Sequence, residues 1–140
     1  MTTEALSIYG LKPVAHVQIV DGKFIIDATD PEAMRLTESV YAFLIGEEIV
    51  RIGSSKGVLR TRFNAWQRDI TNAMCGRRSS APPWEGEFWL SVLPPGVTGT
   101  VWARKGTTIT TPAGTFNAYL SEESYLIGHH LPRMNRSKHR

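Results

Sequence analysis

The sequence predicts a mixed α/β protein of the α+β type, made of antiparallel strand pairs and separate helices. Two pairs of apolar runs are each joined by a short turn, which is typical of β-hairpins. A third segment repeats large apolar residues at helical spacing. The chain has 140 residues, which is enough for one hydrophobic core and too few for two. We therefore expect a single domain.

Two β-hairpins are predicted in the N-terminal part of the chain. Asp21-Gly22 is a strong two-residue turn signal, and Gly46-Glu47 follows a continuous apolar run. The predicted strands are residues 14–20 and 24–27 in the first hairpin, and residues 40–45 and 49–53 in the second. Between the hairpins, Asp30 and Pro31 are typical of a helix start, so we expect a short helix that ends before Ser39.

A longer helix is predicted after the polar turn at residues 53–57. Large apolar residues follow Leu59 at helical spacing: Phe63, Trp66 and Ile70 come four, seven and eleven residues after it. This spacing places all four on one face of the helix. This face is expected to pack on the sheet.

The C-terminal half is predicted to contain two helices and further strands. We expect a short helix at residues 84–93, a strand at 98–104 and a hairpin within 105–119. Ser121 is expected to cap the last helix, and Pro132 to end it.

Composition and charge restrict the classes of partner. The longest apolar run, residues 40–45, is too short to span a bilayer, and the first residues lack a signal-peptide pattern. Cys75 is the only cysteine, which fits a reducing, cytoplasmic setting. The net charge is only +3, but arginines gather in three segments, near residues 60–68, 77–78 and 133–140. This grouping favours a partner that carries phosphate.

The last predicted helix carries an acid on its apolar face. Glu123 shares a helical stripe with Leu126, Ile127 and His130. A carboxylate directed toward a core costs free energy unless a positive group meets it, typically a metal ion or an arginine. The alternative is that Glu123 is a plain first-turn acid that complements the helix dipole, a role that Glu122 could fill instead.

Four segments together resemble the GIY-YIG nuclease family. They are Val40-Tyr41, then Arg51-Ile52-Gly53-Ser54-Ser55, then Arg62-Phe63, and finally Glu123 with Leu126-Ile127, Pro132 and Asn135. The similarity covers residues 39–70 and 97–135. The last segment matches at every anchor position, whereas residues 39–41 keep only the tyrosine of the first family motif.

The resemblance implies a small three-stranded antiparallel central sheet flanked by helices, with the N-terminal hairpin as an extra element. Residues 1–38 would hold that hairpin and the short helix, residues 39–135 the catalytic core with an insertion at about 77–119, and residues 136–140 a basic tail. The implied activity is endonuclease hydrolysis of DNA phosphodiester bonds with Mg²⁺ or Mn²⁺. A single cutting centre would break both strands as a homodimer or in two visits.

The resemblance also assigns roles to residues. Tyr41 would be the general base, Arg62 would bind the scissile phosphate, and Glu123 would hold the metal ion. Asn135 would hold the last helix in place through amide hydrogen bonds. Arg60 lies as near the family's arginine position as Arg62 does; we choose Arg62 because it precedes a large apolar residue.

Arg51 stands where the family's second motif begins with tyrosine. Our hypothesis is that Arg51 favours the ionised form of Tyr41 and grips phosphate, because tyrosine is a poor base at its ordinary pKa of about 10. The opposing interpretation is a nucleic-acid-binding protein on the same fold that barely cuts DNA.

Further contacts to DNA are expected from cations around these residues, namely Lys56, Arg60, His130, Arg133 and Arg136. Several simpler roles compete with the functional ones. Tyr41 could be a core tyrosine, and His130 a partly buried histidine rather than a phosphate ligand. Trp84, Trp89 and Trp102 could stack on bases, but we expect them in the core.

Overall fold

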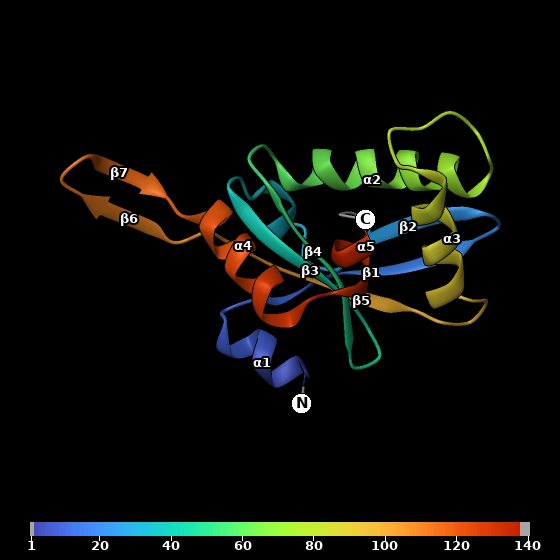
Figure 1. The fold of residues 1–140 in the computed structure, drawn as a ribbon, viewed down its shortest axis with the longest axis horizontal. Coiled ribbons are helices and arrows are strands. Elements are labelled where there is room, and N and C mark those ends of the chain that lie inside the picture. Colours follow the sequence, from blue (N-terminus) through green and yellow to red (C-terminus); the bar gives the residue numbers. More distant parts are fainter. Residues whose placement is uncertain (1, 138–140) are drawn as a thin grey trace.

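The computed structural model describes residues 2–137, and their side chains through Asn135. The chain forms one five-stranded sheet, a separate two-stranded hairpin, and helices on both faces of the sheet (Figure 1). The strands are β1 (Lys12–Val20), β2 (Lys23–Ala28), β3 (Ser39–Ile45), β4 (Glu48–Ser55), β5 (Gly99–Lys105), β6 (Thr108–Thr111) and β7 (Gly114–Asn117). The helices are α1 (Thr2–Ile8), α2 (Leu59–Met74), α3 (Pro83–Val92), α4 (Tyr119–His130) and α5 (Arg133–Ser137), with a short 3-10 helix η1 (Ala33–Arg35).

The sheet order is β2-β1-β5-β3-β4, and every neighbouring pair is antiparallel. The expected three-stranded sheet is therefore wrong: the sheet has five strands, because β1 pairs with β5 and brings the N-terminal hairpin into the same sheet. The hairpin itself forms as predicted, with Asp21 and Gly22 both at positive φ, as a two-residue primed turn requires. β4 lies at the far edge.

Apolar residues on the two faces of β3 build two separate cores. Tyr41 and Phe43 pack with α2 and α3, whereas Val40, Ala42 and Leu44 pack with α1 and α4. Because β3 is covered on both faces, nearly all of its residues are buried, which explains its continuous apolar run. The predicted stripe on α2 faces the first core, with Leu59, Phe63 and Ile70 buried.

Two predicted details of the helices need correction. Helix α4 begins at Tyr119 rather than at a Ser121 cap, because the Asn117 side chain accepts a hydrogen bond from the Tyr119 amide at 3.0 Å and starts the helix earlier. The segment after Asp30 forms only the three residues of η1, although Asp30 does accept the Ala33 amide hydrogen bond. Helix α1 was not expected from the sequence.

The hairpin β6–β7 projects away from the body of the molecule, just before α4 (Figure 1). Helix α4 ends with Leu131 in the left-handed conformation, and α5 follows after Pro132. Within residues 2–137, no helix combines the length and the apolar character needed to cross a membrane.

Candidate active site at the β4 edge

The candidate site lies where Tyr41 crosses the edge strand β4. Tyr41 on β3 is directly opposite Gly53 on β4. A side chain on Gly53 would clash with the phenol, since a Cβ there would lie 2.6 Å from Tyr41 Cζ and 2.7 Å from its hydroxyl oxygen. Gly53 therefore lets the Tyr41 ring lie over β4 and brings its hydroxyl to the edge of the sheet.

The Tyr41 side chain is almost fully buried, with 2% of its surface exposed. Its hydroxyl oxygen accepts a hydrogen bond from Trp66 Nε1 at 3.1 Å. Burial raises the pKa of Tyr41 above its ordinary value of 10.0; Arg62, Arg51 and the Trp66 donor act in the opposite direction, and Glu123 adds to the rise. The hydroxyl is therefore protonated at neutral pH in the protein alone.

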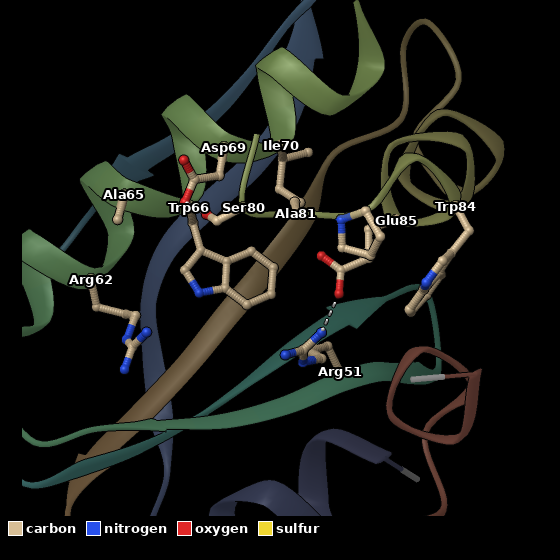
Figure 2. Close-up of a pocket in the computed structure, with 11 residues that line it drawn as sticks. Arg51, Arg62, Ala65, Trp66, Asp69, Ile70, Ser80, Ala81, Trp84 and Glu85 are labelled. Atoms are coloured by element: carbon tan, nitrogen blue, oxygen red, sulfur yellow. Dashed lines mark hydrogen bonds and ion pairs between the residues drawn. The ribbon is translucent and has the colours of Figure 1, made fainter. Parts of the chain in front are cut away.

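Arg51 lies on the same face of the β3–β4 hairpin as Tyr41, opposite Phe43. Its guanidinium donates to Glu85 Oε1 at 3.3 Å and lies 5.0 Å from the centre of the Trp66 ring (Figure 2). Both charged side chains are largely buried, with 12% of Arg51 and 11% of Glu85 exposed. Arg51 is thus held beside Tyr41 by an ion pair, and its Nε has no partner among the described residues.

Helix α3 can place Glu85 there because it packs very closely on α2. A Cβ on Gly86 would lie 2.7 Å from the backbone carbon of Ala73 in α2. The absence of that side chain lets the first turn of α3 approach the cleft between the two helices, where Glu85 is directed at Arg51 (Figure 2).

Arg62 and Trp66 come from the same side of α2 and both line this cleft (Figure 2). Arg62 is exposed, and among the charges near Tyr41 it does most to favour the ionised phenol. An exposed guanidinium beside a tyrosine hydroxyl has free donors with which to bind a phosphate.

Glu123 approaches the edge of β4 from the other face of the sheet, on α4. Its Oε1 accepts a hydrogen bond from the Ser54 hydroxyl at 2.8 Å, and it is half-buried. No described residue donates to Oε2. Ser54 directly follows Gly53, the residue against which the Tyr41 ring lies, so Glu123 and Tyr41 approach the same stretch of β4 from opposite faces.

The donor set at Glu123 fits a hard divalent cation held mainly by water and substrate. Mg²⁺ is commonly bound through one or two carboxylates together with substrate phosphates. Among residues 2–137, no group of three or more His, Cys, Asp or Glu side chains forms a multi-ligand metal site. Glu123 is the carboxylate in this part of the site that could hold such an ion.

Asn135 fixes α5 to the edge of β4. Its amide donates to the Ile52 carbonyl at 3.0 Å and accepts from the Ile52 amide at 2.9 Å, so it pairs both backbone groups of one edge residue. Asn135 is buried. It positions the strand that carries Arg51 and Gly53.

The cations expected to contact DNA lie in different surroundings. Lys56 and Arg60 are exposed near the start of α2. His130 is half-buried and 2.9 Å from the Tyr9 hydroxyl, and burial together with the charge of His129 lowers its pKa. Arg133 makes two hydrogen bonds to Glu48, at 2.6 and 2.7 Å. The side chains of Arg136 and of the predicted basic tail at 136–140 lie outside the described residues.

A cleft of about 310 Å³ adjoins the site between α2, the loop before α3, and the first turn of α3 (Figure 2). It shares Arg51, Arg62 and Trp66 with the surroundings of Tyr41, but neither Tyr41 nor Glu123 lines it. Its lining consists of Arg51, Arg62, Ala65, Trp66, Asp69, Ile70, Ser80, Ala81, Pro82, Trp84 and Glu85.

The sequence placed Trp66 on the buried face of a helix and Ser54 in a polar turn, and it gave no role to Glu85; the contacts of these three residues in the site were not expected. The helical position of Trp66, one turn after Arg62, was a usable signal. Glu85 contacts Arg51, 34 residues away in the sequence, and Ser54 contacts Glu123, 69 residues away. A local sequence pattern cannot predict contacts over such separations. Trp89 and Trp102 are buried as expected, whereas Trp84 is only half-buried.

Two solved structures share this architecture. A mutant of bacteriophage T4 EndoII aligns with a TM-score of 0.65 and 20% sequence identity, over 94% of this chain and 96% of the other. Restriction endonuclease HPY188I, in complex with product DNA, aligns with a TM-score of 0.55 and 18% identity, over 93% and 82%. No protein-family model matches the sequence, and a search of curated proteins finds no relative. The similarity therefore establishes a fold that a restriction endonuclease also has.

Proposed function

We propose that this protein is a divalent-cation-dependent DNA endonuclease of the GIY-YIG type, which hydrolyses phosphodiester bonds at the β4 edge. The observation that carries the proposal is the convergence of a phenol, two guanidiniums and a carboxylate from four elements. Tyr41, Arg51, Arg62 and Glu123 come from β3, β4, α2 and α4. Arg51 and Ser54, the partner of Glu123, lie within two residues of Gly53 opposite Tyr41. Arg62 lies one helical turn before Trp66, which donates to the Tyr41 hydroxyl. The same fold occurs in an enzyme that cuts DNA.

Each of these groups has a chemical task in hydrolysis. Tyr41 takes a proton from the attacking water, and the water oxygen then forms the new bond to phosphorus as the bond to the leaving oxygen breaks. Arg62 binds the scissile phosphate and stabilises the charge that develops on its oxygens. Arg51 favours the ionised form of Tyr41 from within its ion pair with Glu85.

Glu123 would hold the divalent cation, with Ser54 orienting the carboxylate through the hydrogen bond to Oε1. A bound cation would supply positive charge to the phosphate and the leaving oxygen. Ionisation of Tyr41 is the demanding step for the chain itself, because burial opposes it.

A cleavage assay on a short end-labelled DNA duplex, with and without Mg²⁺, tests the proposal. We expect cation-dependent shortening of the labelled strand by the wild-type protein. Glu123→Gln keeps the size of the side chain but removes its charge, so the rate should fall by about 100-fold or more. An uncut duplex in Mg²⁺ and in Mn²⁺, with folded protein, would reject the endonuclease.

The burial of Tyr41 favours a second candidate, a protein that binds DNA on this fold without cutting it. Fluorescence anisotropy of the same duplex in a chelator separates the two. Binding that weakens steeply with salt, together with no cleavage in either metal ion, would support the binding protein, because phosphate contacts release counterions. Binding and cation-dependent cleavage together support the nuclease.

A further inference from the structure

We propose that the cleft between α2 and α3 is a binding pocket for an extruded guanine base next to the phosphate that is cut. This inference rests on the proposed nuclease function and identifies a nucleotide subsite for it. The cleft, at about 310 Å³, falls in the range of small-molecule pockets, which begins at roughly 300 Å³. It opens beside Arg62 and Arg51, so a base inside it would be attached to a phosphate at the proposed cutting site (Figure 2).

Two indole rings line the cleft, those of Trp66 and Trp84 (Figure 2). Trp66 packs against the rings of Phe43 and Trp89, so it is a fixed wall of the cleft. Trp84 is half-buried: it packs against the first core and also lines the cleft. An aromatic ring in the wall of a cleft beside a phosphate-binding region can stack on a nucleobase.

Glu85 gives the cleft its selectivity. Its carboxylate points into the cleft and is 11% exposed (Figure 2). Among the described residues, the only side chain that donates a hydrogen bond to Glu85 is Arg51, through a long 3.3 Å bond to Oε1, so the other oxygen remains available as an acceptor. An ionised carboxylate only accepts hydrogen bonds, so Glu85 would select a base that presents hydrogen-bond donors.

The second acid that lines the cleft is Asp69, and both of its carboxylate oxygens already accept hydrogen bonds within the protein. Its two oxygens accept hydrogen bonds from Arg68 at 3.0 Å and from Ser80 at 2.7 Å. Burial acts to raise the pKa of Asp69, but these donors outweigh it and lower the pKa. Asp69 therefore ties the loop before α3 to α2 and keeps the cleft open, which leaves Glu85 to recognise the ligand.

Among the four DNA bases, guanine fits this acceptor best. Its Watson–Crick edge presents two adjacent donors, the ring N1–H and the exocyclic N2 amine, whereas adenine, cytosine and thymine each present only one donor group along that edge. Bases taken out of the stack are read through this edge while stacked on apolar or aromatic side chains. A carboxylate pairs with two adjacent N–H donors, and Trp84 would stack on the ring.

The test is binding of the four deoxynucleoside monophosphates in a chelator, followed by NMR of the tryptophan indole N–H signals. All four nucleotides present the same phosphate group to Arg62, so any difference in their affinities is due to the base. We expect dGMP to shift the Trp84 and Trp66 signals, to leave that of Trp102 unchanged, and to bind at least about five-fold tighter than dAMP. Equal affinity for all four nucleotides would reject the proposal that the cleft binds guanine.

Variants test the separate roles of the two residues. Trp84→Ala should weaken the binding of all four nucleotides, because it removes a stacking surface, and Trp84→Phe should keep most of the affinity. Glu85→Gln replaces one acceptor by a donor while Arg51 retains an acceptor, so most of the about five-fold preference for dGMP should be lost. Phe116→Ala, a half-exposed aromatic on β7, is the matched control. Unchanged dGMP affinity in a folded Trp84→Ala variant, or unchanged dGMP selectivity in a folded Glu85→Gln variant, overturns the assignment.

The two proposals fail separately. A protein that selects dGMP but cuts no DNA keeps the pocket and loses the nuclease. A protein that cuts DNA but binds the four nucleotides equally keeps the nuclease and loses the pocket.

Discussion

Tyr41 and Gly53 form the tightest contact in the candidate site. The phenol occupies the space where any other residue would place its Cβ, at 2.6 Å from the ring. Backbone atoms of a β-strand cannot yield by that much, so the ring itself would have to move. The position of the Tyr41 hydroxyl is thus set by a missing side chain on the neighbouring strand.

Gly53→Ala should therefore displace Tyr41 and break its hydrogen bond with Trp66. Overpacking of this kind costs about 1–3 kcal/mol of folding free energy, and we expect cleavage to fall by at least about tenfold beyond any effect of unfolding. Chemical denaturation and the duplex assay measure the two effects. Gly57→Ala is the control, since a Cβ there meets nothing within 4 Å. A Gly53→Ala protein as active as Gly57→Ala would contradict the assigned geometry.

The pKa of Tyr41 links the site to pH. Burial keeps the phenol protonated, so the cleavage rate should rise as pH increases toward the pKa of this group. Arg51 lowers that pKa, and its loss should move the rise to higher pH. The comparison needs Arg51→Ala in a Glu85→Gln background, measured against Glu85→Gln alone, because a buried Glu85 without Arg51 would be destabilising. Superimposable pH–rate profiles would exclude the role of Arg51.

At the scale of elements, α5 is held to the edge of β4 by one amide. Removal of Asn135 leaves the amide and the carbonyl of Ile52 without partners at a buried edge. Each unsatisfied backbone group costs about 1–3 kcal/mol. Asn135→Ala should thus lower the free energy of unfolding by about 2 kcal/mol or more, as measured by denaturant titration. Asn135→Asp keeps an acceptor for the Ile52 amide but not a donor for the carbonyl, and should also destabilise. A loss below about 0.5 kcal/mol would show that α5 is held otherwise.

Helix α4 is anchored at its start by Glu122, which pairs with Arg104 on β5 at 2.6 Å and accepts from the Thr107 amide and hydroxyl. Burial acts to raise the pKa of Glu122, but these donors outweigh it and lower the pKa below 4.5. A lowered pKa in the folded state means that the ionised group stabilises the fold above its unfolded pKa and loses that effect as pH falls.

Glu122→Gln should therefore destabilise the protein at pH 7, and its deficit should shrink as pH falls below 4.5, the ordinary pKa of the group. Thermal denaturation of both proteins between neutral and acidic pH measures this difference. Glu4, a glutamate in the first turn of the terminal helix α1, provides a control as Glu4→Gln. A deficit that stays constant with pH would show that the charge of Glu122 is not what anchors α4.

The elements that sequence predicts well are those with local signals. The Asp21-Gly22 turn fixed the first hairpin, and the spacing of Leu59, Phe63 and Ile70 identified the buried face of α2. The start of α4 was missed because Asn117 lies outside the apolar pattern of the helix it initiates. Local patterns thus give the type of an element more reliably than its boundary.

For the whole molecule, the limit is long-range pairing. The five-stranded sheet requires Ala15 to pair with Val101, and a local apolar pattern does not specify such a partner. The same limit applies to the candidate site, whose side chains are brought together by long-range packing. The family resemblance suggested Tyr41, Arg62 and Glu123. The ion pair that restrains Arg51 depends on how α3 packs on α2, and the burial of Tyr41 depends on how α2 packs on β3.

The proposed nuclease cuts DNA at one edge of one sheet. Relaxation of supercoiled plasmid in Mg²⁺ or Mn²⁺ tests it most directly, with wild-type protein beside Glu123→Gln, Tyr41→Phe and the exposed neighbour control Ser124→Ala. One site per chain predicts nicked circles before linear DNA. We expect wild type and Ser124→Ala to nick the plasmid at similar rates, and the other two variants to be slower by about 100-fold or more. Intact plasmid with the wild type, or equal nicking by Glu123→Gln, would contradict the central claim.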